Sequence, residues 1–219
     1  MKVNAKEYII VKKINIRRKT MNIILASASP RRKELLSLLI DDFTVFTVPT
    51  DERTDETAPE RIVMDISRKK ALAVAQVHPA DLIISADTLV FCGGRPLGKP
   101  VDKAHAEQML HELSGKDHEV YTGFCLIHGD NVLSDYERTL VHFCEMSERE
   151  ICNYAATDEP YDKAGAYGIQ GKGGSFVTRY EGDFDNVIGL CVKSLEDILT
   201  RKFDVKLKPR VRTWQWKQK

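Results

Sequence analysis

The sequence predicts an α/β protein with a mixed central sheet and flanking helices, divided into two lobes around a cleft. Three observations lead to this prediction. The chain has 219 residues, of which 42% are hydrophobic, so it can bury a sizeable core. Between residues 21 and 205, apolar runs typical of strands alternate with stretches of helical periodicity. No internal repeat occurs, and no apolar stretch is long enough to cross a membrane.

In the first half of the chain, the pattern predicts four strands and two helices. The strands are short apolar runs bounded by turn residues: 22–26, 43–48, 82–85 and 89–91. The helices have apolar residues on one side: 30–39 and 58–77. Thr57 and Glu60 have the spacing of a capping box, which predicts the start of the second helix. Asp87 lies between the last two strands, and Gly93-Gly94 predicts a hairpin turn after them.

In the second half, the pattern predicts an antiparallel strand pair and three helices. The strands are 118–128 and 131–144, and the helices are 102–113, 147–156 and 192–202. Ser147 and Glu150 repeat the capping-box spacing at the start of the middle helix. Residues 157–179 form a long segment interrupted by glycines. A loop of this length inside a compact domain is usually functional.

Charge and cysteine content restrict the expected partners and compartment. Residues 1–20 carry seven Lys/Arg and residues 206–219 carry six, which leaves the body, 21–205, with a net charge of about −11. We therefore expect a basic N-terminal extension, one domain and a basic C-terminal tail. Basic ends can bind polyanions, but we expect neither a nucleic-acid nor a membrane partner. Five scattered cysteines without a Cys-x-x-Cys pair, and no secretory signal, favour a cytoplasmic protein.

The start of the first helix has the composition of an anion site. Ser29 stands where a helix N-cap belongs, and Pro30 suits the first turn because no amide hydrogen is needed there. Free amides and the helix dipole favour an anion at this end, whereas the cations of Arg31 and Arg32 are unfavourable there without one. With Ser27 just before the cap, the pattern favours phosphate binding. The alternative is a capped surface helix with a basic first turn.

Charged residues elsewhere could complete such a site. A carboxylate between apolar runs, as at Asp87, is costly unless it is paired, metal-bound or catalytic, although it could also cap a strand end. Lys99, between Gly98 and Pro100, can reach a cleft. Four acids follow strand 43–48: Asp51, Glu52, Asp55 and Glu56. If the strands are parallel, one acid could share a divalent cation with Asp87, and most of the others are expected to face solvent.

Several familiar signatures are absent, including the P-loop, the dinucleotide-binding glycine pattern and the zinc-protease motif. The six histidines are scattered. We expect His105, His111 and His118 to be exposed and to have no functional role.

Taken together, five motifs resemble the Maf family of nucleoside triphosphate pyrophosphatases over residues 21–200. They are Leu25-Ala-Ser-Ala-Ser-Pro-Arg-Arg32, Ser85-Ala-Asp-Thr88, Gly98-Lys-Pro100, Thr122-Gly123 and Glu159-Pro-Tyr-Asp-Lys-Ala-Gly-Ala-Tyr-Gly-Ile-Gln-Gly171. The resemblance implies a cytoplasmic homodimer whose fold is like that of the inosine triphosphate pyrophosphatases. It also implies a divalent cation, Mg²⁺ or Mn²⁺, and cleavage between the α- and β-phosphates of a nucleotide.

The resemblance assigns roles to particular residues. It places nine in the site: Ser27, Ser29, Arg31, Arg32, Glu52, Lys70, Asp87, Lys99 and Gln170. The two arginines would hold the phosphate chain, and the two lysines would neutralise charge on the reacting phosphate and the leaving pyrophosphate. Asp87 resembles the acceptor of the proton from water, and Glu52, with or without Asp87, would hold the metal. Because a metal-bound carboxylate is a poor base, these roles compete, and we favour Asp87 as general base.

The segment Tyr167–Gly171 is similar to that of the branch acting on dTTP and UTP. Arg31, Thr88 and Gln170 stand at the positions linked to that preference. A primary amide both donates and accepts, so Gln170 could pair with a pyrimidine edge. Two alternatives remain: the same chemistry on modified nucleotides such as 7-methyl-GTP or 5-methyl-UTP, or a nucleotide-binding regulator of cell division.

Overall fold

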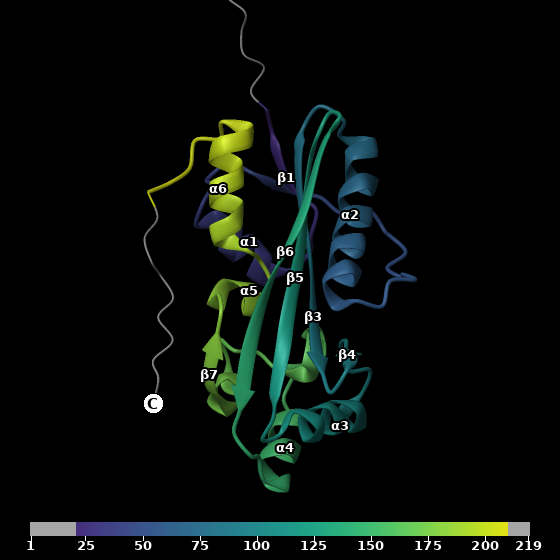
Figure 1. Cartoon of the computed structure of the whole chain (residues 1–219), viewed down its shortest axis with the longest axis vertical. Helices are drawn as coiled ribbons and strands as arrows, with labels where there is room; N and C mark the ends of the chain where they lie inside the picture. The colour runs from purple at the N-terminus through teal and green to yellow at the C-terminus, as the bar shows by residue number, and fades with distance from the viewer. Residues whose placement is uncertain (1–20, 210–219) are drawn as a thin grey trace, which may run out of the picture.

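The computed structural model describes residues 21–209 and is built around one mixed seven-stranded sheet (Figure 1). The strands are β1 (Ile23–Leu25), β2 (Thr44–Val45), β3 (Leu82–Cys92), β4 (Arg95–Leu97), β5 (Asp117–His128), β6 (Asn131–Phe143) and β7 (Val177–Glu181). Their order is β2-β1-β3-β5-β6-β7, with β4 paired to β3. β1 is parallel to β2 and β3, and all other pairs are antiparallel. The predicted mixed α/β class is confirmed.

Within the described part of the chain, six α-helices flank the sheet unevenly. They are α1 (Pro30–Ser37), α2 (Pro59–Val77), α3 (Lys103–Leu113), α4 (Glu148–Ala155), α5 (Phe184–Ile188) and α6 (Val192–Phe203). α2 alone covers one face over a small apolar cluster, and the other helices contribute to a larger core on the opposite face. Gly123 on β5 permits the close approach of α2, because a Cβ there would lie 2.4 Å from the Val63 carbonyl carbon. No helix among the described residues is both long and apolar enough to cross a membrane.

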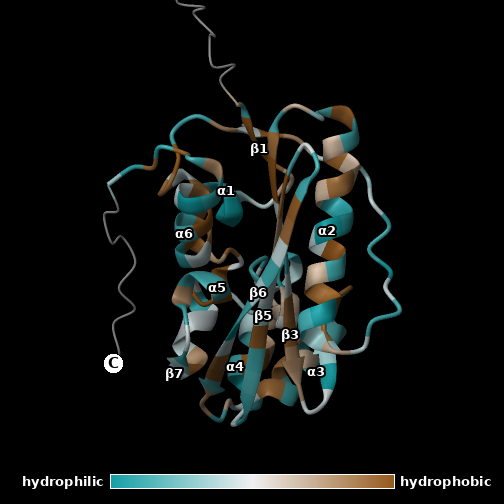
Figure 2. Cartoon of the chain, turned by 45° about the horizontal axis from the view of Figure 1, so that its top comes forward, coloured by the Kyte–Doolittle hydropathy of each residue, from teal (hydrophilic) through white to brown (hydrophobic). Residues whose placement is uncertain are grey.

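Hydropathy follows this layering. β1 and β3 are mainly hydrophobic, whereas the first part of β6 is largely hydrophilic (Figure 2). Strands covered on both faces need apolar residues on both sides, and the exposed start of β6 does not. The buried side chains of the sheet are therefore concentrated in β1, β3 and β5.

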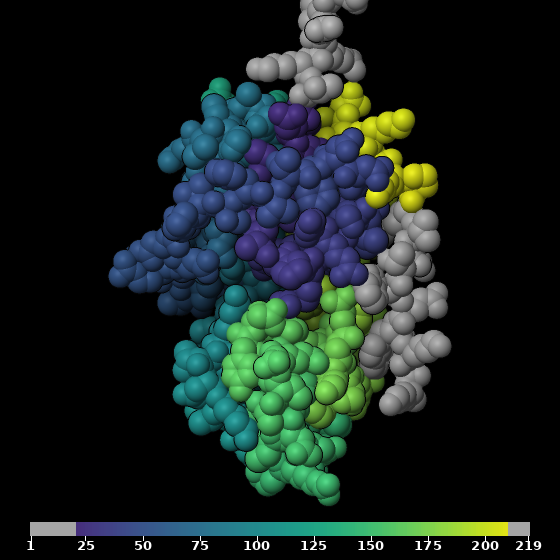
Figure 3. All heavy atoms as spheres, turned by 180° about the vertical axis from the view of Figure 1, so that it is seen from behind, coloured from purple at the N-terminus to yellow at the C-terminus, as the bar shows by residue number. Residues whose placement is uncertain are grey.

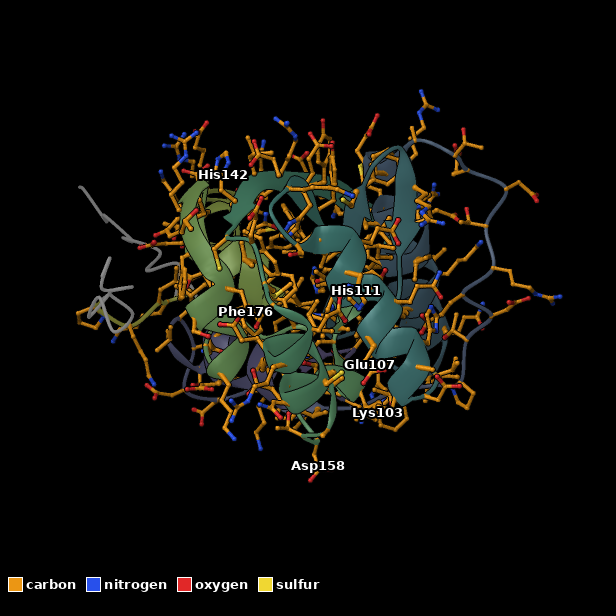
Figure 4. All side chains as sticks on the ribbon, turned by 90° about the horizontal axis from the view of Figure 1, so that it is seen from below. Lys103, Glu107, His111, His142, Asp158 and Phe176 are labelled. Carbon is orange, nitrogen blue, oxygen red and sulfur yellow. The ribbon has the colours of Figure 1, made fainter. Side chains whose placement is uncertain are left out.

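Helices α3 and α4 cover the lower end of the molecule as it is drawn in Figure 1. Lys103, Glu107 and His111 follow one another along α3, and His111 lies 3.2 Å from Glu148 on α4 (Figure 4). Phe176 packs inside this end against Tyr154 and Phe143. Residues 157–176, which we call the late loop, contain three short 3-10 turns and return the chain from α4 to β7.

The predicted elements mostly form, with four corrections. The two strands expected around Asp87 are one continuous strand, β3, because β5 pairs with it along most of its length, including Asp87, while β1 pairs with its first three residues. The strand expected at 43–48 is shorter in the structure, where only the two residues of β2 pair with β1. The capping box predicted at Thr57 does not form, because Ala58 is the N-cap of α2 and makes no side-chain bond; the one at Ser147 does form. The last correction is that two elements were not predicted, α5 and β7, because the first residues of β7 were assigned to the glycine-interrupted segment 157–179.

The ends of the chain lie only partly within the described residues. The basic extension predicted at 1–20, and residues 210–219 of the basic tail, lie outside them. The described start of that tail contacts the segment just after α1: the Lys208 amide donates to the Leu39 carbonyl at 2.9 Å, and Lys208 Nζ lies 2.5 Å from Asp41 Oδ1.

Candidate active site

A cavity lies between the start of α1, the middle of β3, α2 and the late loop. Its volume is about 1290 Å³. The ten side chains predicted for the site all line it: Ser27, Ser29, Arg31, Arg32, Glu52, Lys70, Asp87, Thr88, Lys99 and Gln170. The fold therefore brings residues from both halves of the chain to one place.

α1 begins at the cavity because the local sequence caps it there. Ser29 has extended backbone, with φ −67° and ψ 120°, and its hydroxyl accepts from the Arg32 amide at 3.5 Å. Pro30 occupies the first turn, which contains no acidic residue. The free amides and the helix dipole make this end electropositive. The helix start that phosphate binding requires is therefore present.

Arg32 is held entirely by neutral oxygen atoms. Its guanidinium donates to Ser27 Oγ at 3.2 Å, Thr88 Oγ1 at 3.0 Å and the Gly189 carbonyl at 2.8 Å. Among the described residues, no carboxylate forms an ion pair with it. Burial lowers the pKa of Arg32, although the charge of Asp87 opposes this effect. A partly buried cation without an anionic partner is costly, so the position favours a bound anion.

Arg31, by contrast, already has an anionic partner. Its Nη1 lies 2.5 Å from Asp162 Oδ2, and its Nη2 donates to the Asp162 carbonyl at 3.2 Å. Burial raises the pKa of Asp162, but hydrogen bonds from Lys163 and Arg31 outweigh it and lower that pKa. Seen from behind, the green late loop lies directly against the purple-to-blue segment around α1 (Figure 3). This ion pair therefore joins the two sides of the cavity.

Lys70 on α2 lies between two carboxylates. Its Nζ is 2.7 Å from Asp87 Oδ1 and 3.0 Å from Glu52 Oε1. The side chains of Asp87 and Lys70 are 16% and 18% exposed, whereas that of Glu52 is 58% exposed. β1 ends near Leu25, which pairs with Ile84, and β3 continues beyond it. Asp87 therefore lies past the end of β1, where the strand edge is open to the cavity.

The carboxylates of Glu52 and Asp87 fit a divalent cation. Both contact the same Lys70 ammonium, so they face a common point. Mg²⁺ is commonly bound by one or two carboxylates together with water and substrate phosphate oxygens. In the part of the chain that the structure describes, no group of three or more metal-binding side chains occurs. Phosphate oxygens and water would therefore have to complete the coordination.

Two of the cavity side chains are open to a ligand. Lys99 follows β4 and Gln170 lies in the late loop, and both residues are exposed. Within residues 21–209, neither side chain makes a hydrogen bond or ion pair. Of the four acids at 51–56, only Glu52 lines the cavity, and Asp51 instead pairs with Arg53.

Glu159, to which the sequence analysis assigned no role, holds the late loop in shape. Its carboxylate accepts from the amides of Lys172 at 3.0 Å and Gly173 at 3.1 Å. A Cβ at Gly171 would lie 2.3 Å from this carboxylate, so a larger residue there would displace the carboxylate from these amides. The turn held in this way carries Gln170. In the sequence, the only indication of this role is that Glu159 is an acid at the start of a segment interrupted by glycines.

His118 is buried, so its predicted exposure is wrong. The residue is 1% exposed on β5, and its Nε2 lies 2.8 Å from Tyr167 Oη in the late loop. Burial lowers the pKa of His118 to about 3. The pattern around His118 gave no sign of burial, because the covering loop lies far away in sequence. His111 is exposed, as expected.

Comparison with known proteins agrees with the resemblance. A "dTTP/UTP pyrophosphatase" of Bacillus cytotoxicus is 49% identical over 173 residues, covering 78% of this chain and 91% of that protein. A "dTTP/UTP pyrophosphatase" of a Thermoanaerobacter species is 46% identical over 190 residues, covering 85% and 100%. Among solved structures, the Staphylococcus aureus Ham1 protein matches with a TM-score of 0.45 and 13% identity, over 56% of this chain and 71% of that one.

A family model described as "Maf-like protein" matches residues 22–202. This match includes every side chain that lines the cavity. The chain belongs to the Maf-like protein family.

Proposed function

We propose that the chain is a nucleoside triphosphate pyrophosphatase that hydrolyses dTTP and UTP to the monophosphate and pyrophosphate. Its family and the names of its relatives support this activity. One structural observation carries it: the Arg32 guanidinium, which has no anionic partner among residues 21–209, lies at a helix N-terminus in the same cavity as the Lys70–Asp87 pair. A polyphosphate bound there would have its reacting phosphate near a carboxylate base.

The start of α1 binds the polyphosphate chain. Arg32 and the free amides of the first turn contact its oxygens, and Arg31 joins them when the substrate competes with Asp162 for its guanidinium. Lys99, exposed at the cavity rim, neutralises charge on the departing pyrophosphate.

Asp87 acts as general base. As the oxygen of water bonds to the α-phosphorus, Asp87 accepts a proton and the bond from the α-phosphorus to the bridging oxygen breaks, releasing pyrophosphate. Lys70, 2.7 Å from Asp87, orients the carboxylate and offsets the negative charge that develops. Glu52, together with phosphate oxygens and water, would hold Mg²⁺ or Mn²⁺, which when bound would polarise the phosphoryl oxygens.

Gln170 reads the base. The exposed amide both donates and accepts, which matches the adjacent N3–H and carbonyl groups of uracil and thymine. Cytosine presents an acceptor and an amino group instead. Because an amide can turn over to match either pattern, the proposed preference for UTP and dTTP over CTP rests on the names of the relatives together with the position of Gln170 in the cavity.

The test is an assay of purified protein with Mg²⁺ or Mn²⁺ against UTP, dTTP, CTP, 5-methyl-UTP and 7-methyl-GTP in ¹⁸O-labelled water. We expect UMP or dTMP that carries the label, together with unlabelled pyrophosphate. Label in pyrophosphate would place the attack at the β-phosphorus, and release of UDP would contradict the reaction. A higher kcat/KM for a modified nucleotide would change the substrate but not the chemistry.

A further inference from the structure

A row of buried polar groups lies behind Arg32 and has no role in the chemistry described above. The Thr88 hydroxyl accepts from Arg32 Nη2 at 3.0 Å and lies 3.0 Å from Thr122 Oγ1 on β5. Thr122 Oγ1 in turn donates to the Asn186 carbonyl of α5 at 2.9 Å. Thr122 and Asn186 are fully buried. The row therefore leads from the guanidinium across β3 and β5, on one face of the sheet, to α5.

The direction of each hydrogen bond in this row follows from counting hydrogens. A hydroxyl has one hydrogen, and a carbonyl only accepts, so the Thr122 hydrogen is committed to Asn186. Thr88 must then donate its own hydrogen to Thr122 Oγ1. The lone pair that remains toward the cavity accepts from Arg32. Thr88 consequently has no hydrogen left to offer a ligand.

The far end of the row is firmly anchored. The Asn186 side-chain amide donates to the Val120 carbonyl at 3.0 Å and to Thr139 Oγ1 at 2.8 Å. The chain then continues from Asn186 to Gly189, whose carbonyl accepts from Arg32 Nε at 2.8 Å. The same short segment thus holds the guanidinium twice, once directly and once through the two threonines.

We propose that Thr122 is a positioning residue that, through Thr88, fixes the Arg32 guanidinium against the polyphosphate chain of the ligand. The inference rests on the proposed function for the identity of the substrate, but not for the binding of a polyphosphate. It gives Thr88 an indirect role: it orients a phosphate-binding arginine and does not read the base. We call the hydrogen bond from Thr88 to Thr122 the relay. Its loss should therefore weaken the binding of all nucleotides by the same factor.

The test compares Thr122→Val, which removes the hydroxyl but keeps the shape, with Thr122→Ser, which keeps the hydroxyl. We expect Thr122→Val to raise KM about ten-fold for both UTP and CTP, since a net hydrogen bond contributes about that factor. Its Kd for inorganic tripolyphosphate, measured by calorimetry, should rise by the same factor. Thr122→Ser should stay within about two-fold of wild type. Ser85→Ala, which removes a buried hydroxyl bond to the Ser67 carbonyl on the opposite sheet face, is the control for general destabilisation.

A double-mutant cycle keeps the proposal testable if Thr122→Val folds poorly. Thr88→Val breaks the same relay at a half-buried position, and the double variant should bind tripolyphosphate no worse than either single one. Additive losses would overturn the relay. So would an altered UTP-to-CTP preference with unchanged tripolyphosphate binding, or wild-type protein that does not bind tripolyphosphate. If wild type hydrolyses no nucleotide, the proposed function fails, and the tripolyphosphate comparison still decides the relay.

Discussion

The two sides of the cavity are built differently. On one side, which we call the sheet wall, β1, α1, α2 and β3 place Arg32, Lys70 and Asp87 on regular elements. On the other, the late loop presents Gln170 on a turn held by the Glu159 carboxylate and supported by the Tyr167–His118 contact. A sheet edge fixes groups within narrow limits, which suits phosphate chemistry. A loop can present a base-reading amide without changing that chemistry. Substitutions in the sheet wall should therefore impair catalysis or phosphate binding, and substitutions in the late loop should impair base preference.

Asp87→Asn should produce the largest effect, because it removes the proposed base from the sheet wall. We expect kcat to fall about 10²- to 10⁴-fold while KM for UTP changes little. Asparagine has nearly the same shape, and Lys70 keeps Glu52 as a partner, so the thermal midpoint should stay close to that of wild type. Steady-state kinetics and thermal unfolding measure both quantities.

The same variant separates the two roles considered for Asp87. If it were mainly a metal ligand, raising the Mn²⁺ concentration would restore much of the lost rate. For a general base we expect no recovery at saturating metal. Recovery to within a few-fold of wild type would therefore reject the assignment.

The two walls also differ in how well they can be predicted from sequence. The helix start at Ser29 was predictable because its capping signals are local. The continuity of β3 through Asp87 was not, because pairing with β5 overrides the weak strand propensity of Ala86-Asp87. Apart from its resemblance to the family motif, the late loop could be recognised as functional only from its length and its glycines. The role of Glu159 depends on backbone amides that a sequence pattern does not show.

His118 tests the support beneath the late loop. Burial lowers the pKa of His118 to about 3, with Asp117 opposing and His142 reinforcing the shift, whereas an unfolded histidine titrates near 6.5. Below pH 6.5 the unfolded chain binds a proton that the folded chain does not, so the free energy of unfolding falls as pH falls. Between pH 7.5 and 5 this one group should cost about 2 kcal/mol.

Urea unfolding at both pH values measures this effect. His118→Gln retains a polar partner for Tyr167 but does not titrate, so its stability should depend less steeply on pH than that of wild type. His111→Gln, a change at an exposed site on α3, should keep the wild-type dependence (Figure 4). An equal pH dependence in wild type and His118→Gln would refute the buried neutral state.

Glu159→Gln should loosen the late loop and leave the sheet wall intact. Oε1 accepts from Tyr154 and Gly173, and Oε2 accepts from Lys172. The NH₂ group of a glutamine would therefore face at least one of these N–H or O–H donors and could not accept from it. We expect about a ten-fold loss of kcat/KM for UTP, a smaller preference for UTP over CTP, and unchanged tripolyphosphate affinity.

Glu148→Gln removes the same charge at an exposed position on α4 and serves as the control. It should leave both kcat/KM and base preference unchanged. Weaker tripolyphosphate binding in Glu159→Gln would mean that the late loop also shapes the phosphate site, and the division of labour between the two walls would be wrong.

Asp162→Asn should have the smallest effect, and its sign is informative because Asp162 is the point where the walls meet. In the free protein this carboxylate pairs with Arg31, so a substrate that uses Arg31 has to displace it. The Asp162 side chain is 55% exposed, so its ion pair contributes at most about 1 kcal/mol. Its removal should lower KM for UTP about two- to three-fold at low salt, and the gain should shrink at high salt because ions screen the pair.

Asp158→Asn removes the same charge from a side chain that points away from the molecule, and it should leave KM unchanged (Figure 4). A higher KM in Asp162→Asn would mean that the ion pair orients Arg31 for the substrate, so the loop would then assist phosphate binding instead of competing with it.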